Sequence, residues 1–169
     1  MKTKILSILF LFALALFSNA QDFSQLNSYL LVDGADYGKA EPKVKECVNY
    51  ILSVPIDDQS ANRTDALQFI IRWMVGTPDF SFGIGQSAAN ISKNDTNLMG
   101  LYMVCITKVG LEHREIAKDN GQMDYETIMT LLPYCEKESN NVKLNKELKK
   151  MIKQRNAGTL KEYLAAYWK

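Results

Sequence analysis

The stretch LMGLYMVCITKV, residues 98–109, is apolar on most sides when it is wound as an α-helix. A second stretch, ALQFIIRWM at residues 66–74, has the same character. A helix without a clear polar face is stable in water only when other elements cover it on several sides. Both segments are therefore predicted to be the central helices of a bundle.

The ends of these two helices carry ordinary helix signals. Asn62 is the predicted N-cap of the earlier helix, and Gly76 ends it. Asn94 or Asp95 caps the later one. The sequence between them, TPDFSFGIGQSAANISK at residues 77–93, loses the helical period and predicts a long connection, in which one turn of helix remains an open alternative. Connections of this length are often functional.

Four further segments carry one apolar stripe at helical spacing. The first lies between Pro42, which suits a first helical turn, and Pro55, which stops the helix. The second follows a polar turn at residues 119–121 and reaches Pro133, which kinks or ends it. The last two are separated by Gly158. The stripes are Val44, Cys47, Val48, Ile51 and Leu52; Tyr125, Ile128, Met129, Leu132 and Cys135; Val142, Leu148, Met151 and Ile152; and Leu160, Tyr163, Leu164 and Tyr167.

About six helices predict an all-α domain over residues 40–169, built as a single compact bundle. The alternative is a short stack of helical hairpins, because helix pairs begin at similar intervals along the chain. Thr159 and Glu162 have the spacing of a capping box for the final helix. Residues 21–39 show no decisive pattern, so an extended segment, a short helix and partial disorder all remain open for them.

The first twenty residues have the composition of a secretory signal peptide. Lys2 and Lys4 precede a run at residues 5–17 that is apolar except for Ser7, and small residues at positions 18 and 20 form a signal-peptidase site. Cleavage after Ala20 would release a bacterial periplasmic or secreted protein of 149 residues. We expect no membrane-spanning segment in the mature chain, because no later stretch is long and apolar enough.

Charge is distributed unevenly along the mature chain. Residues 21–141 contain 10 Lys or Arg and 17 Asp or Glu, whereas residues 142–169 contain 8 and 2. Lys149, Lys150 and Lys153 belong to this basic segment, which is either a solvated face, a complement to the acidic remainder of the chain, or a contact for an anionic surface. A nucleic acid partner is not expected, because the overall charge is near zero.

The three cysteines, Cys47, Cys105 and Cys135, would meet an oxidising compartment after export. A disulfide between two of them would leave the third thiol free, and the sequence does not distinguish among the three pairs. All three residues lie on apolar helix faces. Buried, unreactive thiols are therefore the alternative.

No set of residues points to catalysis, a metal or a cofactor. The single histidine, His113, lies two helical turns from Cys105 and is expected at an exposed helix end. Zinc-type spacings are absent from the sequence, and nucleotide-binding fingerprints are incomplete. Asp57 and Asp58, together with Asp79, have the chemistry of a hydrolytic carboxylate pair, but residues beside prolines more often stabilise turns.

The connection that begins at residue 77 contains two large apolar residues, Phe80 and Phe82, next to Asp79. The two rings either fold back onto the core, which we favour, or form a contact patch. Asp79, Phe80 and Phe82 are therefore candidate binding residues, and the C-terminal lysines Lys149, Lys150 and Lys153 are the others.

Three stretches together resemble small exported helical proteins of Gram-negative bacteria: ALQFIIRWMVGTPDFSF (66–82), LMGLYMVCITK (98–108) and NNVKLNKELKKMIKQRNAGTLKEYL (140–164). The resemblance implies export and a helical fold, and it implies no activity. The leading hypothesis is an exported, non-catalytic module that binds another protein or an envelope component. The alternatives are a small envelope enzyme that uses carboxylates, and a surface-associated protein that docks through its basic C-terminal helix.

Overall fold

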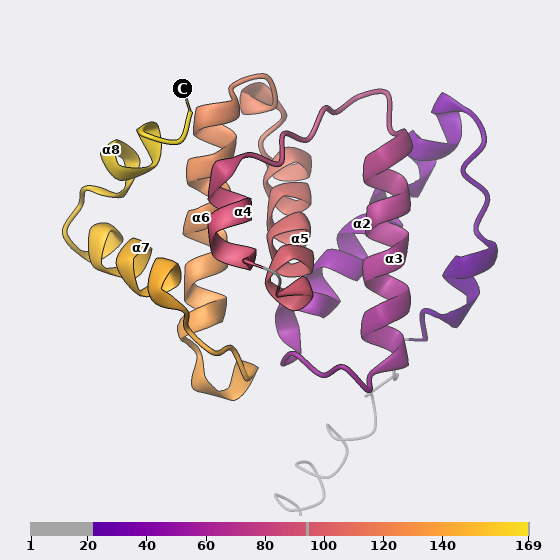
Figure 1. The fold of residues 1–169 in the computed structure, drawn as a ribbon. Coiled ribbons are helices and arrows are strands. Elements are labelled where there is room, and N and C mark those ends of the chain that lie inside the picture. The colour runs from indigo at the N-terminus through magenta and orange to yellow at the C-terminus, as the bar shows by residue number, and fades with distance from the viewer. Residues whose placement is uncertain (1–21, 94, 169) are drawn as a thin grey trace, which may run out of the picture.

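A computed structural model describes residues 22–93 and 95–168 (Figure 1). Over these residues the chain is all-helical and compact, without a strand, which confirms the predicted all-α bundle. The predicted signal peptide and its cleavage site lie outside the described residues. The helices are η2 (Ser24–Ser28), α2 (Gly34–Ser53), α3 (Ala61–Gly76), α4 (Gln86–Ser92), α5 (Thr96–Glu112), η3 (Arg114–Ile116), α6 (Asn120–Glu136), η4 (Glu138–Asn140), α7 (Lys146–Asn156) and α8 (Leu160–Ala165), where η denotes a 3-10 helix.

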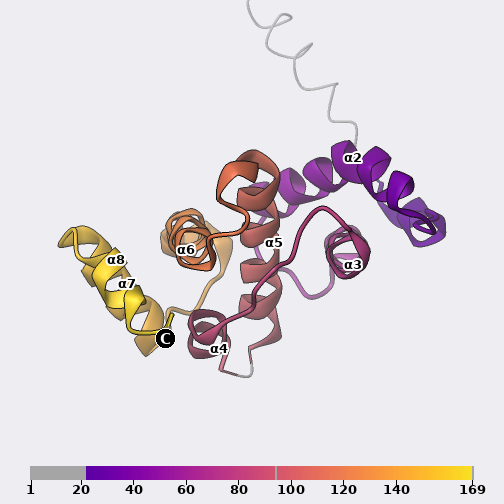
Figure 2. The same ribbon diagram turned by 90° about the horizontal axis from the view of Figure 1, so that it is seen from above.

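Helix α5 lies at the centre of the molecule, as its apolar sequence predicts (Figure 2). Its Val104 and Leu111 pack into a cluster with α2 and α3. Its Leu101 and Cys105 pack into a second cluster with α4, α6, α7 and α8. The core therefore has two parts, and α5 contributes side chains to both.

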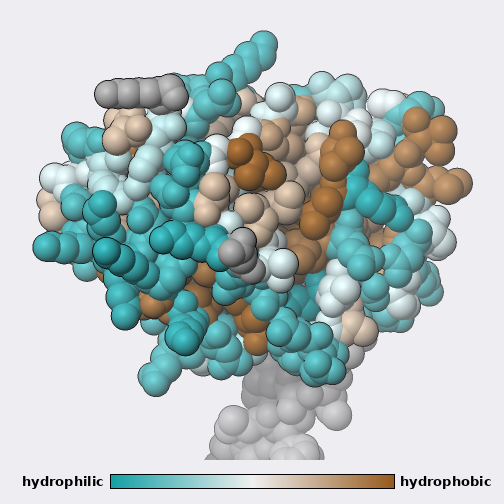
Figure 3. Space-filling model, in the orientation of Figure 1, coloured by the Kyte–Doolittle hydropathy of each residue, from teal (hydrophilic) through white to brown (hydrophobic). Residues whose placement is uncertain are grey.

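Helix α3 is less enclosed than its sequence predicts. Phe69, Ile70 and Trp73 are buried on one side of α3. Helices α2 and α5 pack against α3, and the segment around η2 lies along another side of it, where the Arg72 guanidinium donates to backbone oxygens of that segment. The remaining face is open to solvent: Val75 is 84% exposed, and apolar side chains are visible at the surface over α3 (Figure 3). The prediction that other elements cover α3 on several sides is therefore confirmed, except on this face.

Helix α2 begins earlier than predicted, at Gly34, so the last part of the segment 21–39, whose structure the sequence left open, is helical. Asp33 and Asp36 form a capping box, in which each side chain accepts from the backbone N–H of the other residue. Pro42 consequently lies inside the helix and not in its first turn. A proline there removes one backbone hydrogen bond, which accounts for the bend of α2 in Figure 2.

The other helix ends agree only partly with the predicted signals. Ser60, and not Asn62, caps α3 by accepting from the backbone N–H of residue 63. Asp95 caps α5 as predicted, and Gly158 adopts the left-handed conformation, at φ 72°, after α7. The hydroxyl of Thr159 bonds back to residue 154, so the predicted capping box of α8 does not form.

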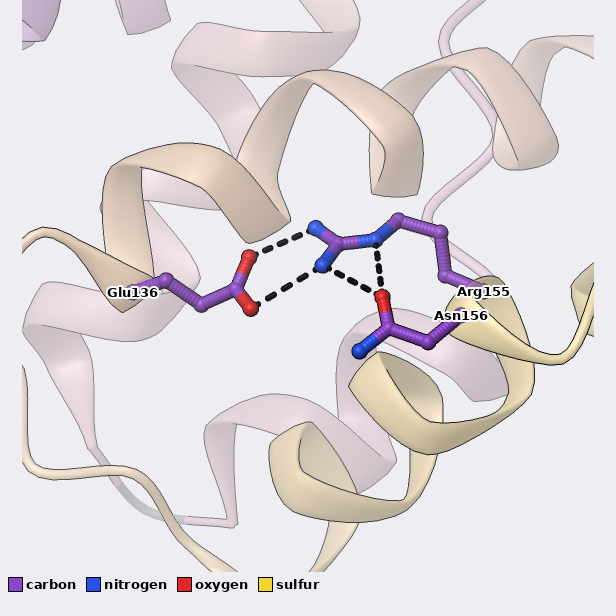
Figure 4. Close-up of polar contacts among 3 residues, drawn as sticks. All are labelled: Glu136, Arg155 and Asn156. Carbon is purple, nitrogen blue, oxygen red and sulfur yellow. Dashed lines mark hydrogen bonds and ion pairs between the residues drawn. The ribbon is translucent and has the colours of Figure 1, made fainter.

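Helix α6 continues three residues beyond Pro133 and ends beside α7. There the Arg155 guanidinium donates to both carboxylate oxygens of Glu136, at 2.6 and 2.9 Å, and also to Asn156 (Figure 4). The hydrogen bonds to Glu136 raise the pKa of Arg155. This forked ion pair holds α7 against the end of α6.

Candidate functional site

The connection between α3 and α4 is attached to the core by its two phenylalanines. Phe80 and Phe82 stack on each other, with ring centroids 5.5 Å apart, and both rings contact Trp73. A Cβ added at Gly110 of α5 would lie 3.0 Å from the Phe82 ring, so this glycine makes room for the loop. The rings are half-buried and fold back onto the core, the alternative we favoured over a contact patch.

This loop contributes residues to two hollows. The first, of about 680 Å³, is lined by Asp79 and Phe80 of the loop together with Arg114 and Lys118. The Arg114 guanidinium lies 4.8 Å from the centroid of the Phe80 ring and forms an ion pair with Glu41. This hollow is therefore of mixed charge, and its arginine is already engaged.

The second hollow, which we call the Asp124 cavity, has a volume of about 240 Å³. Its lining residues come from the end of the connection, from α4, α5 and α6, and from the segment after α8. Figures 1 and 2 show the arrangement of these elements. Its lining consists of Gly83, Ile84, Gly85, Gln86, Ser87, Tyr102, Asn120, Asp124, Tyr167 and Trp168.

Asp124 is the polar centre of this cavity. The residue is only 8% exposed, and its carboxylate accepts three hydrogen bonds from other side chains. The Ser87 hydroxyl and the Trp168 indole N–H donate to Oδ2 at 2.5 and 2.9 Å, and the Tyr102 hydroxyl donates to Oδ1 at 2.9 Å. Helices α4, α5 and α6 and the C-terminal segment thus meet at one carboxylate.

All three donors to Asp124 are uncharged, and the described residues that line the Asp124 cavity include no Lys, Arg or His. Within the described residues Asp124 forms no ion pair. Burial, reinforced by the charge of Asp124, raises the pKa of Tyr102, so this phenol remains a donor at neutral pH. The cavity therefore presents a negative charge that no cation of the described chain neutralises.

Aromatic rings form much of the cavity wall. Trp168 lies against bare backbone at Gly121, where an added Cβ would be 2.9 Å from the indole ring. The hydroxyl of Tyr167 donates to Glu147 of α7 and pairs with Tyr163 of α8. Burial and these hydrogen bonds raise the pKa of Tyr167. The segment after α8 is thus held by hydrogen bonds of both its rings: Tyr167 bonds to α7 and α8, and Trp168 bonds to Asp124 of α6.

Sequence reasoning missed Asp124 and its three donors. The sequence predicts a polar turn at residues 119–121, just before Asp124, but α6 already begins at residue 120. One signal was present: Asp124 lies four residues before Ile128 and seven before Leu131, both buried, so it falls on the apolar stripe of the helix. Ser87, Tyr102 and Trp168 gave no comparable signal.

The predicted carboxylate pair is not brought together. Asp58 precedes α3 and bonds to Asn97, while Asp57 stabilises the same turn by accepting from a backbone N–H. Asp79 follows the other end of α3. A helix of 16 residues separates the two positions by about 24 Å. That separation exceeds the distance between the two acids of a glycosidase.

The predicted basic face is present on α7. Lys149, Lys150 and Lys153 are all exposed, and the Lys150 ammonium lies 4.5 Å from the centroid of the Tyr163 ring. Leu148 and Met151, on the opposite side of α7, are fully buried in the bundle. An anionic surface could therefore contact the lysines of α7, but not the apolar face of this helix, which packs into the bundle.

The cysteines are free, buried thiols in the structure. Cys47 lies in the cluster around α2 and α3, and Cys105 and Cys135 lie in the other. Burial raises the pKa of Cys47 and of Cys135 to about 12, and that of Cys105 further still. His113 lies at the exposed C-terminal end of α5, as its flanking charges predict.

Within the ranges that the structure describes, no three His, Cys, Asp or Glu side chains are grouped so that they could hold a metal ion. In the same ranges, no helix combines the length and the apolar character needed to cross a membrane. The chain matches no protein-family model, no curated protein sequence and no solved structure. Its function has to be inferred from its own residues.

Proposed function

We propose that the protein is an exported, non-catalytic binding protein, and that the Asp124 cavity is where it holds its ligand. The observation that carries this proposal is the buried Asp124 carboxylate, on which three neutral donors from three separate elements converge at the wall of a cavity. Small-molecule sites are typically concave and largely apolar, with a few polar groups that fix the orientation of the ligand.

The size of the cavity restricts the ligand. Pockets for drug-sized molecules usually measure roughly 300–1,000 Å³. The Asp124 cavity, at about 240 Å³, suits a smaller molecule or a single side chain of a partner protein. Gly83, Gly85 and Asn120 are exposed around it, so a ligand can enter from solvent.

The same geometry favours binding over catalysis. Ser87 is the hydroxyl closest to Asp124, but it is 1% exposed and donates its proton to the carboxylate. Among the described residues, the lining of the cavity includes no histidine, cysteine or second carboxylate that could act with Asp124 as an acid–base pair. Export is supported by the charge and apolar pattern of residues 1–20 and by the resemblance to exported helical proteins.

The test follows the two tryptophan side chains by NMR. Trp168 donates its indole N–H into the Asp124 cavity, whereas buried Trp73 donates to the backbone oxygen of Tyr37. We expect at least one member of a library of small cationic, neutral and anionic fragments to shift the Trp168 indole resonance while leaving that of Trp73 in place. A library that shifts neither resonance, or that shifts only groups outside the cavity, would contradict the proposal.

A further inference from the structure

We infer that the ligand group which enters the Asp124 cavity is an alkylammonium ion, supplied by a free small amine or by a lysine side chain of a partner protein. This inference rests on the proposed binding function and names the chemistry of its ligand. It depends on the charge of the cavity, on the acceptor capacity of Asp124 and on the rings of the wall.

The negative charge of Asp124 favours a cationic ligand. A carboxylate removed from water loses several kcal/mol of hydration unless a partner compensates it. Neutral donors such as Ser87 and Tyr102 replace part of that hydration, but the charge of Asp124 remains. Because the lining that the structure describes includes no cationic side chain, an anionic ligand would be repelled and a cation would be attracted.

Asp124 can still accept a further donor. An ionised carboxylate offers about four acceptor positions, and three donors occupy three of those positions here. Oδ2 accepts from Ser87 and Trp168, whereas among the described residues Oδ1 accepts only from Tyr102. An ammonium N–H bonded to Oδ1 would complete the set. Asn120 lines the same cavity and has an amide oxygen suited to a second N–H.

The wall suits a cation as well. Trp168, Tyr167 and Tyr102 all line the cavity. An ammonium group within about 6 Å of an aromatic face is attracted by the ring, and most strongly by tryptophan. A carboxylate combined with such rings distinguishes ammonium from an amide of the same length, since only the first carries charge. The exposed side chain of Ile84 at the same cavity can contact the alkyl part of the ligand.

The first experiment needs no substitution. Four probes are titrated into the wild-type protein: n-butylammonium, Nα-acetyl-lysine amide, the Nα,Nε-diacetyl form of that amide, and butyrate. We expect the first two to shift the Trp168 indole resonance, with binding that weakens as salt is added, and the last two to leave it in place. Tighter binding of the lysine amide identifies a partner protein as the source, and tighter binding of butylammonium identifies a free amine.

Two pairs of variants locate the site, with affinities measured by calorimetry. Asp124→Asn is expected to weaken butylammonium binding at least about tenfold. Glu126→Gln removes the same charge from the same helix outside the cavity, and it should leave the affinity unchanged. Trp168→Leu should weaken binding about two- to fivefold more than Trp168→Phe, which keeps an aromatic face. The circular-dichroism melting curve of each variant checks that it is folded.

The outcomes separate this inference from the proposed function. If butyrate or the diacetylated amide shifts the Trp168 indole as strongly as butylammonium, the Asp124 cavity binds ligands but does not select ammonium, and the inference is wrong. If no probe and no library fragment binds in the cavity, both the ammonium inference and the proposed binding function are wrong. Equal weakening by Glu126→Gln and Asp124→Asn would place the interaction outside the cavity and would also overturn the inference.

Discussion

At the scale of single residues, Asp124 performs two tasks that depend on the same oxygens. It joins α4, α5 and the segment after α8 to α6, through Ser87, Tyr102 and Trp168. It also supplies the charge of the cavity. Because Ser87 and Tyr102 are almost completely buried, loss of their common acceptor would leave two hydroxyl groups without water or partner.

Replacement of Asp124 should therefore lower the stability of the fold. We expect Asp124→Ala to reduce the free energy of unfolding by about 2–4 kcal/mol, since it leaves buried donors unpaired. Asp124→Asn should cost about 1–2 kcal/mol, because an amide oxygen still accepts. Urea unfolding followed by circular dichroism measures both. An Asp124→Ala protein as stable as the wild type would show that the three hydrogen bonds do not hold the elements together.

The cysteines give a second prediction at this scale. Because burial raises the pKa of Cys47 and Cys135 to about 12, and that of Cys105 further, all three thiols remain protonated at pH 8. Iodoacetamide should label none of the three thiols in the native protein within the time that labels free glutathione completely. All three should react in 6 M guanidinium chloride. Mass spectrometry of the native sample reveals any early adduct.

At the scale of elements, the sequence predicts helices best where their own apolar pattern determines their position. Helix α5 and its cap Asp95 are of this kind, and so is the return of Phe80 to the core. The apolar pattern of α4 does not determine its position, because its seven residues are rich in Ser, Ala and Asn. Packing of the buried Ala88 and Ile91 holds this helix in place. The site escaped prediction because residues distant in sequence, from Ser87 to Trp168, assemble it.

Helix α7 offers a prediction at the same scale. We expect Arg155→Ala to lower the free energy of unfolding by about 1 kcal/mol, because the forked ion pair with Glu136 is partly exposed. Amide hydrogen exchange should accelerate in α7 and α8 more than in α5. Lys153→Ala is the matched control, since Lys153 is exposed on the same helix and belongs to none of the ion pairs of the described residues. Exchange that accelerates equally in both variants would contradict a clamping role.

At the scale of the whole molecule, α5 couples the two parts of the core. Its side chains fill both hydrophobic clusters, so neither part can lose α5 without exposing the other. Trp73 reports on the part built by α2 and α3, and Trp168 reports on the other part. A single domain with such a shared helix is expected to unfold in one cooperative step.

The prediction is that both tryptophans report the same unfolding transition. In one urea titration, the native indole resonances of Trp73 and Trp168 should disappear with the same midpoint. Val104→Ala, which removes two buried methyl groups from the α2 side of α5, should lower both midpoints equally and cost about 2 kcal/mol. An earlier loss of the Trp168 resonance would show that the C-terminal segment detaches on its own.

Tyr167 and Trp168 form one wall of the Asp124 cavity, although they lie outside the helices. Helices α2 to α8 lie between Gly34 and Ala165, so the two rings close the cavity from outside the helical framework. Replacement of both rings by alanine is therefore expected to leave the helices assembled and to open the cavity on one side, which would separate the retention of a ligand from the integrity of the fold.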